Sequence, residues 1–182
     1  MDRARLADPR GVPVIDYRDA TPADGDALDA MAQVIWVETF AHSVSAEDAG
    51  TYLAEAYGPT GKLITDLSSG AARFHLALAD DRVVGYAKLN TPWLPEAEPG
   101  AMQLSQIYVS SDQHGAGVGK ALLDWAIATA RAGDATALLL TVWEENHRAA
   151  AFYRKHGFDH IGDYAFAVGS QIDTDHIMRL AL

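Results

Sequence analysis

Cysteine is absent from this chain of 182 residues. Its absence excludes disulfide frameworks, thiolate metal sites and cysteine nucleophiles. Apolar residues form no run long enough to cross a bilayer, and the first residues lack the apolar stretch of a secretory signal. We therefore expect a cytoplasmic protein that does not act at a membrane.

Basic residues are scarce, with 14 Lys and Arg against 25 Asp and Glu, which gives a formal net charge of −11. A field of this sign repels phosphate backbones, so nucleic acid is not an expected partner. The same field attracts cationic small molecules, although an acidic surface also serves solubility alone.

Hydrophobic residues make up 49 % of the chain, which is enough to bury the core of one domain. No internal repeat, low-complexity tract or linker divides the sequence. We expect a flexible N-terminal arm over residues 1–12 and a single domain over residues 13–182.

Hydrophobic spacing and turn residues predict a mixture of helices and strands. A helix between the strands at 103–109 and 137–143 implies a parallel pair with a right-handed crossover. Hairpins on either side make the sheet mixed, so the fold class is α/β with one mixed sheet. The other strands are predicted at 14–18, 74–79, 82–89, 164–168 and 177–182, and the helices at 23–42, 46–57, 62–68, 115–130 and 148–156.

Three closely spaced glycines, Gly115, Gly117 and Gly119, follow a predicted strand and open a helix. Glycine lets the backbone turn tightly and approach a ligand without a Cβ clash. Free N–H groups at the helix start and the helix dipole then favour an anion. The turn predicts a phosphate or diphosphate site, with a plain tight turn as the structural alternative.

Two common phosphate-binding loops do not fit this spacing. A P-loop would need glycine at position 114 and Ser or Thr at position 121, where the chain has His114 and Ala121. A dinucleotide fingerprint that starts at Gly115 would need glycine at position 120, where the chain has Lys120. Neither a nucleoside triphosphate nor a dinucleotide is therefore the expected ligand.

A second cluster follows the strand at 137–143 and contains Asn146, Phe152, Tyr153 and Gly157. Each residue has an ordinary structural explanation. Asn146 suits a helix N-cap, Phe152 and Tyr153 suit a buried face, and Gly157 suits the position after a helix. Their joint occurrence after the glycine turn favours a functional site.

Both segments resemble the GNAT superfamily of N-acetyltransferases. Residues 104–123 are similar to its acetyl-CoA motif, Gln/Arg-x-x-Gly-x-Gly/Ala, with His114 at the first position. Residues 146–158 match its pattern N-x-x-A-x-x-F-Y-x-x-x-G-F. The resemblance implies a single mixed sheet whose central parallel strands splay apart at the cofactor site, with helices on both faces.

The resemblance also implies acetyl-CoA as co-substrate and no metal. The diphosphate would meet the backbone amides of residues 115–120, and Ile107 and Val109 would offer backbone groups to the pantetheine arm. The implied cofactor-binding residues are Ile107, Tyr108, Val109, His114, Gly115, Ala116, Gly117, Val118, Gly119, Lys120, Asn146, Phe152 and Tyr153.

In the family, a tyrosine at the position of Tyr153 protonates the leaving thiolate. A phenol has a pKa of about 10, close to that of a thiol, so this proton transfer is nearly balanced. The backbone N–H of Val109 would polarise the thioester carbonyl. Gln103 stands where relatives carry glutamate and cannot act as a base. The general base stays open between Glu144, Glu145, His75, His114 and a chain of water molecules.

Further segments, residues 36–40, 52–53, 84–89 and 175–178, resemble bacterial spermidine/spermine N-acetyltransferases of the PaiA type. This likeness covers nearly the whole chain after about Pro13 and implies a small amine as acceptor, with a polyamine as one case and a homodimer as one assembly. Glu38 and His42, one helical turn apart, would line an acidic substrate cleft unless they belong to a solvated helix face.

Antibiotic amines, amino acids and protein N-termini also stay open as acceptors. A non-catalytic acyl-CoA sensor and an α/β domain with neither activity are the alternatives from other classes. Tyr153 favours the enzyme, because a sensor needs no proton donor.

Overall fold

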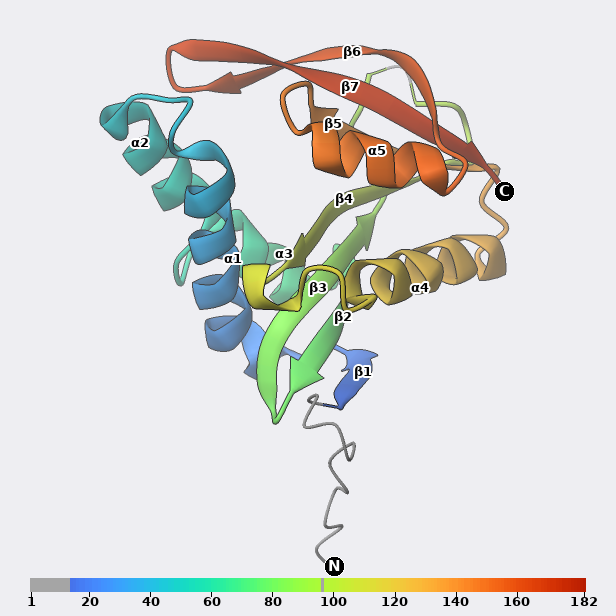
Figure 1. Cartoon of the computed structure of the whole chain (residues 1–182), viewed down its shortest axis with the longest axis horizontal. Coiled ribbons are helices and arrows are strands. Elements are labelled where there is room, and N and C mark those ends of the chain that lie inside the picture. The colour runs from blue at the N-terminus through green and yellow to red at the C-terminus, as the bar shows by residue number, and fades with distance from the viewer. Residues whose placement is uncertain (1–13, 96) are drawn as a thin grey trace, which may run out of the picture.

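Seven strands form one mixed sheet in the computed structural model, which describes residues 14–95 and 97–182 (Figure 1). Their order is β1-β2-β3-β4-β5-β7-β6, with β4 and β5 as the parallel pair. The strands are β1 (Ile15–Asp19), β2 (Ala72–Ala79), β3 (Arg82–Asn90), β4 (Met102–Val109), β5 (Ala137–Trp143), β6 (Asp159–Val168) and β7 (Gln171–Ala181). The predicted mixed sheet is confirmed, while the arm predicted for residues 1–12 lies outside the described residues.

Helices cover both faces of the sheet, as expected (Figure 1). They are α1 (Gly25–Phe40), α2 (Ala46–Ala56), α3 (Lys62–Ser69), α4 (Val118–Ala132) and α5 (His147–Lys155). α4 and α5 share one apolar core with β3, β4 and β5, and α1, α2 and α3 share a second core with β2 and β3. Within the described ranges, no helix combines the length and apolarity that a membrane crossing requires.

The central parallel strands separate soon after they meet. Among the described residues, their ladder joins only Met102 to Leu138 and Gln103 to Leu139. One residue further, the pairing of β3 with β4 shifts register, because Lys88 faces Gln106 while Leu89 faces Leu104. This bulge leaves Ser105 as an extra residue and bends β4. The sheet therefore opens into a V between β4 and β5, which confirms the predicted splay.

Gly85 on β3 explains how α4 reaches the sheet at this opening. A Cβ added there would lie 3.1 Å from the Tyr108 carbonyl oxygen and 3.2 Å from a methyl group of Val118. Both contacts are tighter than ordinary packing. The missing side chain lets the first turn of α4 lie against the strands, so the helix begins beside the end of β4.

The last hairpin is longer than predicted. The sequence predicts strands at 164–168 and 177–182, whereas β6 begins at Asp159 and β7 at Gln171. β6 is an edge strand with one solvated face, and a bulge between His160 and Gly162 interrupts its alternation. A half-solvated edge strand with a bulge has no regular alternation of hydrophobic residues, so the sequence pattern did not predict the first half of β6.

Candidate active site

Two cavities occupy the opening of the sheet and meet inside it. The narrow groove, of about 430 Å³, runs along the end of β4 and the start of α4. The large cavity, of about 630 Å³, lies between α1 and α2 on one side and β5 and β7 on the other. Both are lined by Phe40, Ile107, Tyr108, Asn146, Ala149 and Tyr153. A molecule in the groove and a molecule in the large cavity would therefore touch beside these residues.

The predicted glycine turn forms the floor of the narrow groove. Gly115 and Gly117 have φ values of +83° and +86°, in the left-handed region that favours glycine. A Cβ added at either position would meet no atom within 4 Å. The space above the turn is thus open, and a side chain at either position would fill it.

Backbone donors at the start of α4 face this open turn. The amide of Ala121 is the first to bond back, to the Gly117 carbonyl at 3.0 Å. The amides of Val118, Gly119 and Lys120 precede that bond and have no partner within the helix. The positive end of the helix dipole adds to their attraction for an anion. The turn therefore fits a diphosphate group.

The groove is also basic, although the protein as a whole is acidic. Lys120, Arg148 and Lys155 line it, with Glu38 as its one carboxylate among the described residues. Lys120 is held by Asp124 at 2.6 Å, one helical turn away. The local excess of positive charge suits a ligand with several phosphate groups, such as coenzyme A.

His114, the departure from the family motif, has its ring engaged by neighbours. Its Nδ1 lies 2.7 Å from Nη1 of Arg148 and its Nε2 lies 3.0 Å from the carbonyl oxygen of Val109. A neutral ring with the proton on Nε2 donates to Val109 and accepts from Arg148. His114 therefore ties the turn to β4 and to α5.

Sequence reasoning missed Arg148 and Lys155, which belong to α5 and reach the groove only in the folded chain.

The predicted cofactor-binding residues gather around this groove. All of them line it except Ala116, which lies in the turn between two lining glycines. Asn146 serves as the N-cap of α5, because its side chain accepts the amide of Ala149 at 3.1 Å. It also lines both cavities, so the structural and functional interpretations of Asn146 apply together.

Tyr153 lies where the two cavities join. Its side chain packs edge-on against Phe152 and Phe158, with ring centroids 5.3 Å and 5.6 Å away, and only 8 % of the residue is exposed. Burial raises the pKa of Tyr153 above its usual value. The phenol therefore keeps its proton at neutral pH, and burial makes it a weaker acid than the free phenol whose pKa is close to that of a thiol.

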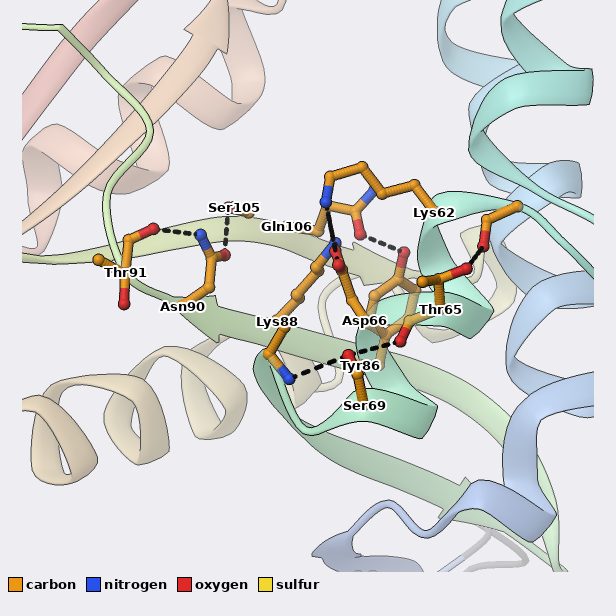
Figure 2. Close-up of polar contacts among 12 residues, drawn as sticks. Lys62, Thr65, Asp66, Ser69, Tyr86, Lys88, Asn90, Thr91, Ser105 and Gln106 are labelled. Carbon is orange, nitrogen blue, oxygen red and sulfur yellow. Dashed lines mark hydrogen bonds and ion pairs between the residues drawn. The ribbon is translucent and has the colours of Figure 1, made fainter.

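The large cavity combines aromatic walls with charged groups. Trp36, Tyr52 and Trp143 form part of the walls, and the rings of Trp36 and Tyr52 stack 4.7 Å apart. Figure 2 shows the ion pair of Lys88 with Asp66, which Lys62 joins from the solvent side. Two more carboxylates of the wall, Asp173 and Asp175, belong to β7.

The structure separates the two predicted substrate residues. Glu38 lines the narrow groove rather than the large cavity. His42 lines neither space, and its ring packs edge-on against Trp143 at 5.8 Å. A role for either residue in substrate binding stays a prediction.

The candidate bases named from the sequence lie outside the large cavity. Glu144 and Glu145 are exposed, and His75 lies on β2, where it stacks on Trp125 and lies 2.6 Å from Asp19. Gln103 is fully buried and accepts the backbone amide of Trp93 at 3.0 Å. Asp175 was missed as a site residue, because the segment 175–178 was noted only for its likeness to PaiA-type enzymes and carries no pattern that indicates a chemical role.

Comparison with known proteins shows a matching family model and several relatives of similar sequence. A family model described as the acetyltransferase (GNAT) family matches residues 29–158. An uncharacterized N-acetyltransferase of Lactobacillus delbrueckii subsp. lactis is 27% identical over 155 residues, covering 84% of this chain and 89% of that protein. One of Mycobacterium tuberculosis is 28% identical, covering 85% of this chain and 96% of that protein.

Solved structures share the architecture. The PaiA N-acetyltransferase of Thermoplasma acidophilum, in complex with coenzyme A, has a TM-score of 0.73 at 24% identity, covering 93% of this chain and 99% of that one. A ribosomal-protein-alanine N-acetyltransferase of Brucella melitensis has a TM-score of 0.67 at 25% identity, covering 92% and 99%.

Proposed function

The chain belongs to the acetyltransferase (GNAT) family, and we propose that it transfers the acetyl group of acetyl-CoA to a primary amine of a cationic small molecule. An aliphatic polyamine is the first acceptor to test. The observation that carries the proposal is the meeting of the narrow groove and the large cavity at Tyr153. A transferase needs two sites that bring its reactants into contact, whereas a sensor needs one.

The narrow groove supports the cofactor half of the proposal. Amides of Val118, Gly119 and Lys120 would bind the diphosphate, and Arg148 and Lys155 would add positive charge. The edge of β4 that faces away from β3 would bind the pantetheine arm by strand-like hydrogen bonds. The PaiA N-acetyltransferase of Thermoplasma acidophilum carries coenzyme A in a related fold, in keeping with this assignment.

At the junction, Tyr153 acts as the general acid. As the carbon–sulfur bond breaks, its hydroxyl gives a proton to the leaving sulfur. The backbone N–H of Val109 would polarise the thioester carbonyl. Much of the rate would come from holding the amine and the thioester in contact, since the two cavities adjoin.

The large cavity supports the acceptor half. Glu55, Asp173 and Asp175 line it, and the net charge of −11 draws cations toward the protein. Trp36 and Tyr52 offer apolar surface beside these carboxylates. An aliphatic polyamine combines positive charges with methylene groups, so it suits both kinds of surface. The likeness of the fold to PaiA agrees with this choice.

The test mixes purified protein with acetyl-CoA, a reagent that detects free thiol, and a panel of amines. The panel contains spermidine, an aminoglycoside, an amino acid and a peptide with a free N-terminus. We expect the fastest thiol release with spermidine. Release only with the aminoglycoside or the peptide would move the acceptor to that class. Binding of acetyl-CoA without turnover on any amine would replace the enzyme with a sensor.

Tyr153→Phe tests the role of the phenol. We expect kcat to fall by about 100-fold while the dissociation constant for acetyl-CoA stays the same, because only the proton donor is lost. Tyr17→Phe, at an exposed tyrosine of β1 that lines neither cavity, is the matched control and should keep full activity. A Tyr153→Phe variant with wild-type kcat would remove Tyr153 from the chemistry.

A further inference from the structure

The carboxylates of the large cavity are not equivalent, and this difference extends the proposed function, on which the present inference rests. Asp66 is held by Lys62 at 2.9 Å and by Lys88 at 2.6 Å. Among the described residues that line the cavity, these two lysines are the only Lys or Arg side chains. Asp66 is therefore neutralised in place and offers little to a cationic ligand.

Asp175 lines the cavity from β7, and within the described part of the chain it forms no ion pair with either lysine. Its position on β7 is in register with Trp143 of β5 and with Tyr164 of β6. Thr141 of β5 lowers the pKa of Asp175, and the charge of Asp175 contributes to the raised pKa of Tyr52 on α2. Asp175 thus belongs to an internal strand and lines the same space as the aromatic wall.

We propose that Asp175 binds the ammonium group of the acceptor and removes its proton, while Asp173 holds a second positive charge of the same molecule. Both residues line the large cavity, and both project from the same face of β7 because they are two positions apart. Two such residues are about 6.6 Å apart along a strand. That spacing is comparable with the distance between neighbouring nitrogens of an aliphatic polyamine.

The surroundings of Asp175 raise its pKa, which makes the carboxylate a better proton acceptor. Burial raises the pKa of Asp175 to about 6, with smaller contributions of the same sign from Asp173 and Glu144, while Thr141 and His176 act in the opposite direction. His176 is itself bound at Nδ1 to Asp163, 3.0 Å away. Asp175 is therefore ionised at neutral pH, yet it holds a proton better than an ordinary carboxylate does.

The proton balance of the reaction follows from these positions. Asp175 takes one proton from the ammonium group, which leaves a neutral amine. The amine nitrogen forms a bond to the thioester carbonyl carbon, the carbon–sulfur bond breaks, and the electron pair leaves with sulfur, which takes the Tyr153 proton. The nitrogen loses its second proton as the amide forms, which restores Tyr153 through water. Asp175 then returns its proton to solvent, so one proton is released per turnover.

Asp175→Asn tests the proposal, because it keeps the shape of the side chain and removes the charge. We expect kcat/KM for spermidine to fall by about 100-fold with no change in acetyl-CoA affinity. In the wild type, kcat/KM should rise with pH through a limb near 6, since Asp175 must be ionised. The variant should lack this limb, and Asp175→Glu should restore it in part. Asp26→Asn, which removes an exposed carboxylate of α1 outside both cavities, is the control, and Glu145→Gln tests a rival base that the sequence suggested.

Asp173→Asn separates the two carboxylates. We expect it to raise KM for spermidine several-fold and to leave KM for a monoamine unchanged, because a monoamine has no second charge to place. Equal effects on both amines would remove Asp173 from the proposal.

The outcomes distinguish this inference from the function on which it rests. A wild type that acetylates no amine ends the proposed function itself. A wild type that acetylates amines, with Asp175→Asn equal to it in kcat/KM and in pH profile, overturns only the role of Asp175. Loss of activity in Glu145→Gln alone would do the same. The Asp175→Asn variant is uninformative about catalysis if it fails to bind acetyl-CoA. In that case the wild-type protein decides: a kcat/KM for spermidine that does not rise with pH near 6 would overturn the role of Asp175.

Discussion

Nζ of Lys88 lies 2.6 Å from Oδ2 of Asp66 in the wall of the large cavity, where the two side chains are only 9 % and 11 % exposed (Figure 2). Lys88 comes from β3 and Asp66 from α3, so the pair joins the helical layer to the sheet. Burial disfavours ionisation of Asp66, yet the hydrogen bonds from Lys88 and Lys62 outweigh it and lower the pKa of Asp66. Burial also lowers the pKa of Lys88, but the hydrogen bond with Asp66 opposes this shift, so the pair exists as two charges in a mostly buried site.

Removing one charge of this pair should destabilise the fold. Asp66→Asn leaves the Lys88 ammonium buried without a counter-charge, so we expect a loss of about 3 kcal/mol in the free energy of unfolding. The double variant Asp66→Asn with Lys88→Met should lose less than the single variant, since no buried charge is left. Urea denaturation at neutral pH measures both.

The pair of Lys120 with Asp124 is the matched control, because its N–O distance is also 2.6 Å but its side chains are 60 % and 54 % exposed. Asp124→Asn should cost about 0.5 kcal/mol or less. The cost of Asp66→Asn should also shrink as the pH falls below about 4, because a lowered carboxyl pKa contributes stability only while the group is ionised. Equal costs for the two variants at neutral pH would contradict a buried pair.

Gly117→Ala should weaken acetyl-CoA binding more than it weakens the fold. Gly117 has a φ of +86°, so alanine there costs about 1 kcal/mol in backbone strain. Its methyl group would also enter the open space above the turn. We expect KM for acetyl-CoA to rise about tenfold, which corresponds to ~1.4 kcal/mol.

Gly70→Ala separates strain from occlusion. Gly70 ends α3 with a φ of +71°, a Cβ there would also meet open space, and the residue lines neither cavity. It should lose a similar amount of stability in thermal unfolding with an unchanged KM. The same rise in KM for both variants would attribute the effect to general destabilisation.

The part of the site that the sequence predicted is local along the chain. The glycines at 115, 117 and 119 and the cluster around Tyr153 each occupy one short segment, and the conformation that they need is set by neighbours in sequence. A turn that requires positive φ favours glycine, and a helix that requires a cap favours residues such as asparagine, so both can be recognised from the residue types in the sequence. The same holds for the parallel strand pair, which follows from one crossover helix.

The acceptor side could not be predicted in this way. Asp66 and Lys88 meet across 22 positions of the chain, and Asp175 reaches the large cavity only because β7 inserts between β5 and β6. A carboxylate on an amphipathic strand or helix looks the same in sequence whether it faces solvent or a cavity. Glu38 is an example of the opposite error. The sequence predicted that it lines the acceptor cleft, whereas it lines the narrow groove.

Arg148 should contribute to acetyl-CoA binding, both directly and through His114. It lines the narrow groove, where a guanidinium can pair with phosphate oxygens, and it lies 2.7 Å from the His114 ring that is tied to Val109. A hydrogen bond to a charged group is worth about 1.5–3 kcal/mol, so Arg148→Ala should raise the dissociation constant for acetyl-CoA by tenfold or more. Isothermal titration at low and high salt measures this.

Arg154→Ala is the control for Arg148, because Arg154 is exposed on the same helix and lines neither cavity. It should bind acetyl-CoA as the wild type does. His114→Ala tests the indirect route. If Arg148 acted only by positioning the imidazole, adding Arg148→Ala to His114→Ala would weaken binding no further. We expect a further loss in the double variant, and that additional loss should diminish with salt, because a phosphate contact at an exposed guanidinium is screened. A double variant equal to His114→Ala at all salt concentrations would assign Arg148 to positioning alone.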